Sequence, residues 1–81
     1  MPQPIRSYAE PSQIEAEAAA VATPAQLPML ARLTAMGWNV AALRGIAGIA
    51  GRLRYGTATI EFSGNGSAYG KLFTDGSFKR N

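Results

Sequence analysis

The sequence predicts an α+β fold in which two or three short N-terminal helices precede an antiparallel β-meander of two to three strands. Two observations predict it. Apolar residues recur at helical spacing up to about residue 51, whereas from residue 52 they alternate, as in a half-buried strand. Glycine-rich turns then divide the alternating part into short segments. A chain of 81 residues suits one compact domain, expected over 12–81.

The N-terminal part is expected to be an extended arm followed by a helix. Residues 1–11 contain three of the five prolines and show little apolar pattern, so they are assigned to the arm. The stretch "SQIE" is typical of a capping box, in which Ser12 and Glu15 accept hydrogen bonds from each other's backbone N–H groups. Thr23, which precedes a proline, is expected to end this first helix, predicted over residues 13–22.

A second helix is expected in "TPAQLPMLARLTAMGW". Thr23 is a candidate cap with Gln26 as its capping-box partner, while Pro28 either distorts the first turn or marks the start of the regular helix. The bulky apolar stripe comprises Leu27, Leu30, Leu33 and Met36. Gly37 suits the left-handed residue that ends a helix, and Trp38 is interpreted as a core anchor that packs back on Leu33.

The C-terminal part predicts strands joined by tight turns. "TATIEF" places Ala58, Ile60 and Phe62 on one side of a strand. "SGNGS" is a glycine-rich turn, "AYGKLF" is the return strand, and "TDGS" carries an Asp-Gly pair of the kind favoured in hairpins. The last residues, "SFKRN", can form a short third strand.

The stretch "LRGIAGIAGRLR" allows three interpretations. The favoured one is a third helix over about 40–51, capped by Asn39, with a bulky core side and a smooth outer side formed by glycines and rimmed by arginines. The second is an irregular apolar loop with Ile46 and Ile49 partly exposed. The third, a phosphate loop, ranks last because no GxxxxGK[ST] or strand-linked GxGxxG pattern is present. The GxxG of KH domains normally has polar or basic residues between its glycines, and here they are apolar.

The side-chain inventory argues against catalysis and cofactors. The chain has no histidine and no cysteine, so neither a Ser-His-Asp nor a Cys-His arrangement can be built and the soft metal ligands are missing. We therefore expect a non-enzymatic protein with no metal and no cofactor. The lack of a signal peptide or of a long apolar run predicts no membrane association and a cytoplasmic location.

Charge is distributed unevenly along a chain whose net charge is +3. Residues 1–40 carry two basic and three acidic side chains, whereas residues 41–81 carry six basic and two acidic ones. A basic half can contact an acidic protein surface or nucleic acid. The candidate partner-binding residues combine the smooth glycine side with nearby cations: Arg44, Gly45, Gly48, Arg52, Arg54 and Lys71.

The function predicted from these features is that of a small binding protein that docks onto another protein and modulates or inhibits it. Its type is that of phage-encoded or mobile-element accessory inhibitors, and self-association is compatible with it. The alternative is a basic nucleic-acid-binding protein. Three helices before a hairpin are similar in outline to a winged-helix domain, with Gly37 of "LTAMGWNVAAL" where a helix-turn-helix turns. A recognition helix needs several polar side chains, and residues 40–50 offer only Arg44.

Overall fold

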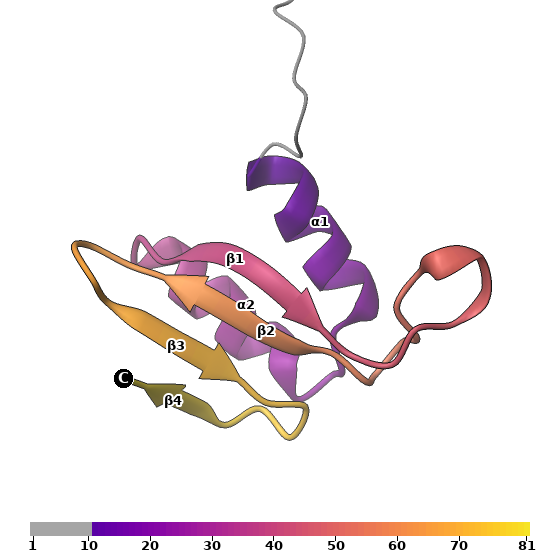
Figure 1. Cartoon of the computed structure of the whole chain (residues 1–81). Coiled ribbons are helices and arrows are strands. Elements are labelled where there is room, and N and C mark those ends of the chain that lie inside the picture. The colour runs from indigo at the N-terminus through magenta and orange to yellow at the C-terminus, as the bar shows by residue number, and fades with distance from the viewer. Residues whose placement is uncertain (1–10) are drawn as a thin grey trace, which may run out of the picture.

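The structure, a computed structural model, describes residues 11–81 as two helices followed by a four-stranded antiparallel sheet (Figure 1). The helices are α1 (Pro11–Val21) and α2 (Gln26–Ala35), and the strands are β1 (Asn39–Arg44), β2 (Thr59–Ser63), β3 (Tyr69–Leu72) and β4 (Phe78–Arg80). The predicted order of helices before a meander is confirmed. The sheet has four strands, whereas the sequence predicts two or three.

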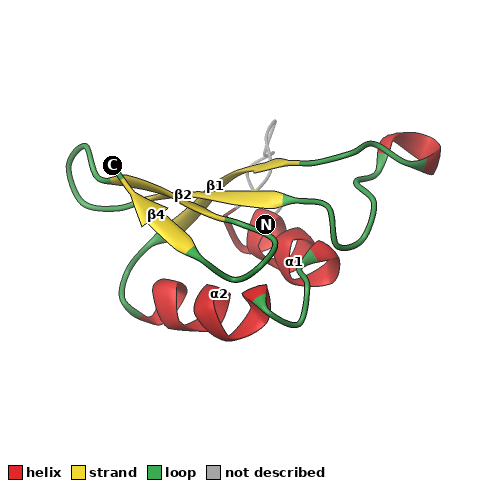
Figure 2. Cartoon of the chain, turned by 90° about the horizontal axis from the view of Figure 1, so that it is seen from below, coloured by secondary structure: helices red, strands yellow, loops and turns green. Residues whose placement is uncertain are grey.

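The molecule has two layers. The strands lie in the order β1-β2-β3-β4, and both helices cover the same face of the sheet (Figure 2). The buried core between the layers comprises Ala18, Ala22, Leu30, Leu33, Val40, Ile60, Phe62 and Leu72. Within residues 11–81 no element covers the opposite face, as is common for antiparallel sheets with one solvated side.

Helix α1 forms close to where the sequence predicts it. It begins at Pro11 and ends at Val21, and a proline in the first turn lacks only an N–H that would have no helical partner. The predicted cap by the Ser12 side chain and the predicted arm, most of which is residues 1–10, lie outside what the structure describes. Small residues on this helix let it lie close to the sheet, where Ala18 is fully buried.

Helix α2 begins with the capping box that the sequence indicates. The backbone N–H of Gln26 donates to Thr23 Oγ1 at 3.1 Å, and the backbone N–H of Thr23 donates to Gln26 Oε1 at 2.9 Å. The sequence does not reveal what the rest of the Gln26 side chain does. It is fully buried, and its Nε2 donates to the carbonyl oxygens of Ala58 at 2.8 Å and Leu72 at 3.2 Å. One side chain therefore caps α2 and fastens it to the sheet.

The end of α2 also follows the prediction. Gly37 has φ +98°, and the N–H of Trp38 donates to the Leu33 carbonyl at 3.0 Å, which is the hydrogen bond of a helix C-terminal motif. Of the predicted stripe, Leu30 and Leu33 are buried, but Leu27 and Met36 are exposed. Side chains three residues apart are offset by about 60° around a helix, so the two ends of this stripe turn away from the face that Leu30 and Leu33 bury.

The predicted third helix is wrong. Residues 39–44 form β1, which pairs with β2 from Asn39 opposite Ser63 to Arg44 opposite Thr59, with an irregularity between Val40 and Ala42. A helix through residues 40–51 would carry three glycines at about 1 kcal/mol each, whereas β1 buries Val40 beside Phe62. Without that helix the winged-helix outline is not formed either.

The predicted strands of the C-terminal part are present. Ala58, Ile60 and Phe62 are fully buried on the helix-covered side. β3 returns beside β2 and β4 beside β3, each antiparallel to its neighbour. The Asp-Gly turn between β3 and β4 forms with Gly76 at φ +92°, a conformation that glycine adopts without steric cost.

Candidate binding surfaces

The connection between β1 and β2 is an ordered loop that projects beyond the sheet (Figures 1 and 2). We call residues 45–58 the finger loop. Its two sides are joined by the Arg54 N–H, which donates to the Ile46 carbonyl at 2.8 Å, and by the Gly48 N–H, which donates to the Arg52 carbonyl. An isolated bridge between Ala47 and Leu53 lies between these bonds. The finger loop thus continues the hairpin as a narrow, hydrogen-bonded extension.

The tip of the finger loop is a short 3₁₀ turn, η1 (Ile49–Gly51). Ala50 has φ +61° and Gly51 has φ +74°, so two successive left-handed residues reverse the chain there. At the base, the Gly56 N–H donates to the carbonyl of Val21 at the end of α1 at 2.9 Å. The tip is therefore presented by its own backbone, while its base is fastened to the helix layer.

The finger loop exposes large apolar side chains. Ile49 at the tip is 93% exposed, Tyr55 is 64% exposed and Ile46 is 56% exposed. Among residues 11–81 three other large apolar side chains are exposed, and these are spread over α2, its C-terminal turn and the end of β3. The finger loop therefore carries half of the large exposed apolar side chains of residues 11–81, and exposed apolar surface is a candidate contact site.

Arginines flank the apolar tip. Arg52 and Arg54 are exposed, and the one ion pair between residues of the described chain joins neither of them. A shallow hollow between the finger loop and α1 is lined by residues of both, among them Leu53, Tyr55 and Glu17. The finger loop therefore offers an exposed apolar tip followed by two arginines that form no ion pair within residues 11–81.

The six residues singled out in the sequence divide between two places. Gly45, Gly48, Arg52 and Arg54 lie in the finger loop, whereas Arg44 and Lys71 lie on strands β1 and β3. The two glycines are positions where the loop has no room for a side chain. A Cβ at Gly45 would lie 3.0 Å from Ala58 Cα, and one at Gly48 would lie 3.0 Å from Arg54 Cγ. Both positions thus allow the two sides of the loop to approach closely, and neither belongs to a smooth helix face.

Arg44 and Lys71 belong to the uncovered face of the sheet, which we call the open sheet face. Alternation along the strands places there Arg44, Thr59, Glu61, Ser63, Tyr69, Lys71, Phe73 and Lys79. Nε of Arg44 lies 2.8 Å from Glu61 Oε2. The alternation of "TATIEF" and "YGKLF" indicates the residues of this face on β2 and β3. Sequence analysis did not join them to Arg44, because the place of Arg44 depends on β1 being a strand and on its register with β2.

Glu61 is an acid held in its ionised form on this face. Its side chain is 7% exposed. The neighbouring Tyr69 hydroxyl lowers the pKa of Glu61 more than any other group does. Burial raises this pKa, and the positive charges of Arg44 and Lys71 lower it further. Glu61 in turn raises the pKa of the Tyr69 hydroxyl. The carboxylate is thus already occupied by partners of its own chain.

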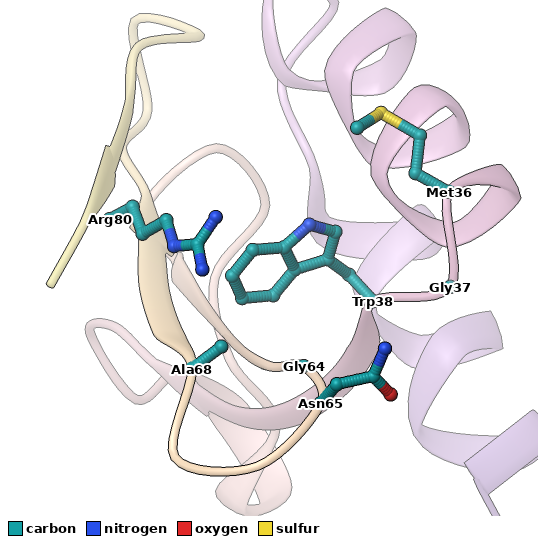
Figure 3. Close-up of a pocket in the computed structure, with 7 residues that line it drawn as sticks. All are labelled: Met36, Gly37, Trp38, Gly64, Asn65, Ala68 and Arg80. Atoms are coloured by element: carbon teal, nitrogen blue, oxygen red, sulfur yellow. The ribbon is translucent and has the colours of Figure 1, made fainter.

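A third candidate surface is a small hollow beside Trp38 (Figure 3). Trp38 is half-buried, and Phe78 meets its ring edge-on with centroids 5.4 Å apart. The guanidinium of Arg80 lies 5.4 Å from the indole centroid, a cation–π contact. Met36, Gly64, Asn65 and Ala68 complete a hollow of about 140 Å³. Trp38 therefore packs against the core, as predicted, and also presents one side to this hollow.

Residues 11–81 contain no cluster of three or more acidic, histidine or cysteine side chains that could hold a metal ion. Within the same range no helix combines the length and the apolar character that a membrane span requires. Comparison of the whole chain with protein-family models, with curated proteins and with solved structures gave no significant match.

Proposed function

We propose that this protein is a small non-enzymatic binding protein that docks onto another protein through the finger loop and modulates it. The observation that carries the proposal is Ile49, a large apolar side chain 93% exposed at the tip of a hydrogen-bonded loop. Exposure of this extent loses the favourable burial of an isoleucine, worth about 1.5–3 kcal/mol. A pocket on a partner can recover that free energy.

The proposed partner site is an apolar pocket with acidic groups at its rim. Ile49 would fill the pocket, with Ile46 and Tyr55 at its margin. Arg52 and Arg54 follow the tip in the sequence and supply charges that an acidic rim complements. Because the finger loop is already ordered by its own hydrogen bonds, docking would lose little conformational entropy.

The test compares partner recovery by three forms of the protein. Wild type, Ile49→Ser and Leu27→Ser are each immobilised and incubated with partner-containing lysate. The proteins that each form retains are then quantified by mass spectrometry. Leu27 is a matched control because it is also an exposed aliphatic residue, on α2. We expect one stoichiometric partner that Leu27→Ser retains and that Ile49→Ser binds at least tenfold more weakly. Equal recovery by all three forms would contradict the proposal.

The competing explanation is self-association, in which a second copy of the chain supplies the pocket that Ile49 fills. Analytical ultracentrifugation of the purified protein distinguishes it from a separate partner. The proposal expects the mass of a monomer for wild type and for Ile49→Ser alike. A wild-type dimer that Ile49→Ser dissociates would assign the finger loop to self-association instead.

A further inference from the structure

We propose that the open sheet face is a second binding surface, one that takes single-stranded nucleic acid. It lies on strands β2, β3 and β4 together with the end of β1, away from the helix layer (Figure 2). This surface shares no residue with the finger loop, so the inference stands independently of the proposed protein partner.

The first observation is a row of three charged side chains in which the cations outnumber the acid. Glu61, Lys71 and Lys79 lie directly opposite one another across β2, β3 and β4. Like charges directly opposite destabilise a sheet, yet Lys71 and Lys79 face each other with no ion-pair partner among residues 11–81. The one acid of the face, Glu61, is occupied by Arg44 and Tyr69. An anion brought from outside would relieve the repulsion between the two lysines.

The second observation is the pair of aromatic side chains around Lys71. Tyr69 and Phe73 lie two residues before and after it, so all three share the open sheet face. Together with Lys79, they line one hollow. Phe73 is 37% exposed. Tyr69 and Glu61 lie on adjacent strands of this face, and Glu61 raises the pKa of the Tyr69 hydroxyl.

Cations interleaved with aromatic rings on a sheet suit an unpaired strand better than a duplex. Phosphates would meet Lys71 and Lys79, while unstacked bases would stack on the rings of Phe73 and Tyr69. In a duplex the bases are already stacked on each other, so the aromatic side chains would gain nothing. The surface offers few groups for reading base edges, so binding would tolerate many sequences.

The experiment is a fluorescence-anisotropy titration of the full chain with a labelled single-stranded oligonucleotide of about 12 nucleotides at several salt concentrations. If two phosphates are neutralised, log K falls against log salt with a slope of about −1.4. Affinity then drops about sevenfold between roughly 50 and 200 mM salt. The duplex of the same sequence is expected to bind more weakly. No binding of the single strand at low salt would overturn the proposal.

Matched variants locate the site. Lys71→Gln combined with Lys79→Gln is expected to flatten the salt dependence, whereas Arg32→Gln, which removes an exposed cation of α2, is expected to leave it unchanged. Phe73→Leu is expected to weaken binding about fivefold or more at an unchanged slope. Binding that survives the double lysine substitution, or that falls equally with Arg32→Gln, would overturn the assignment. Circular dichroism confirms that each variant is folded.

Two further controls test whether the ligand is an acidic protein instead of nucleic acid and whether the nucleic acid binds to the finger loop instead of the open sheet face. Polyglutamate is added as a competing acidic polypeptide, and we expect it to displace the oligonucleotide poorly because it has no bases to stack. Displacement as effective as that by unlabelled oligonucleotide would assign the face to acidic proteins instead. Ile49→Ser is expected to leave nucleic-acid binding unchanged, and loss of binding in that variant would place the nucleic acid on the finger loop.

Discussion

At the scale of single residues, Glu61 shows how a nearly buried acid is stabilised in this fold. Arg44 lies 2.8 Å away on the neighbouring strand, and the Tyr69 hydroxyl lowers the pKa of Glu61 more than any other neighbour. An acid whose pKa is lowered by folding binds its proton more tightly in the unfolded chain. Its stabilising contribution is therefore present above the ordinary value near 4.5 and is lost as the pH falls through the lower folded value.

This linkage predicts a pH-dependent effect of Glu61→Gln. At pH 7 the variant is expected to melt at a lower temperature than wild type. The gap between the two melting temperatures is expected to narrow as the pH is lowered from 7 toward 3, because protonation of Glu61 removes the charge that the variant lacks. Thermal melts followed by circular dichroism at both pH values measure it. Glu17→Gln removes an exposed acid of α1 and serves as the charge-matched control. A gap that stays constant between the two pH values would contradict this role of Glu61.

Residue by residue, the sequence predicts the parts of this fold whose causes are local. Gly37 and Gly76 sit where a helix end and a turn require positive φ, and the Thr23–Gln26 capping box needs only neighbours three residues apart. The pairing of Arg44 with Glu61 bridges 17 residues and depends on the register of β1 with β2. No local pattern encodes that register.

At the scale of elements, Gln26 decides how α2 is attached to the sheet. Its side chain makes hydrogen bonds to the Ala58 and Leu72 carbonyls and accepts one from the Thr23 N–H. Methionine has a similar volume and none of these polar groups. Gln26→Met is therefore expected to destabilise the protein by about 2–4 kcal/mol, because buried backbone groups lose their partners.

Equilibrium urea unfolding tests the role of Gln26. The control is Leu27→Met, the adjacent residue of α2, which is exposed and is expected to change the free energy of unfolding by less than about 0.5 kcal/mol. If Gln26→Met unfolds at the same urea concentration as this control, the side chain does not hold α2 to the sheet.

The elements also show why the segment after Trp38 is mispredicted. Residues 40–50 carry apolar side chains at spacings that suit a helix as well as an irregular β-strand. Glycines every third residue weaken the helix, and an edge position beside β2 lets Val40 and Leu43 reach the core. That outcome depends on a partner strand about 20 residues later, which periodicity within the segment cannot reveal.

At the scale of the whole molecule, the arrangement of the two layers separates two of the candidate binding surfaces. One is the finger loop, and the other is the open sheet face. The cations predicted as one contact set are divided between them, with Arg52 and Arg54 on the loop and Lys71 on the sheet. The sequence predicts that the second half of the chain is the binding half, but separating its charges into two sites requires the topology of the sheet.

The central claim is that the tip of the finger loop contacts a partner protein, and site-specific photo-cross-linking tests it most directly. The photoreactive residue p-benzoylphenylalanine replaces Ile49 in one form of the protein, Leu27 in a second and Lys79 in a third. All three positions are exposed and lie on the finger loop, α2 and the open sheet face respectively. After irradiation with partner-containing lysate, we expect a protein adduct of one defined mass from position 49 and none from positions 27 and 79. An adduct of that mass from position 27 or 79 but not from 49, or no adduct from any position, would contradict the claim.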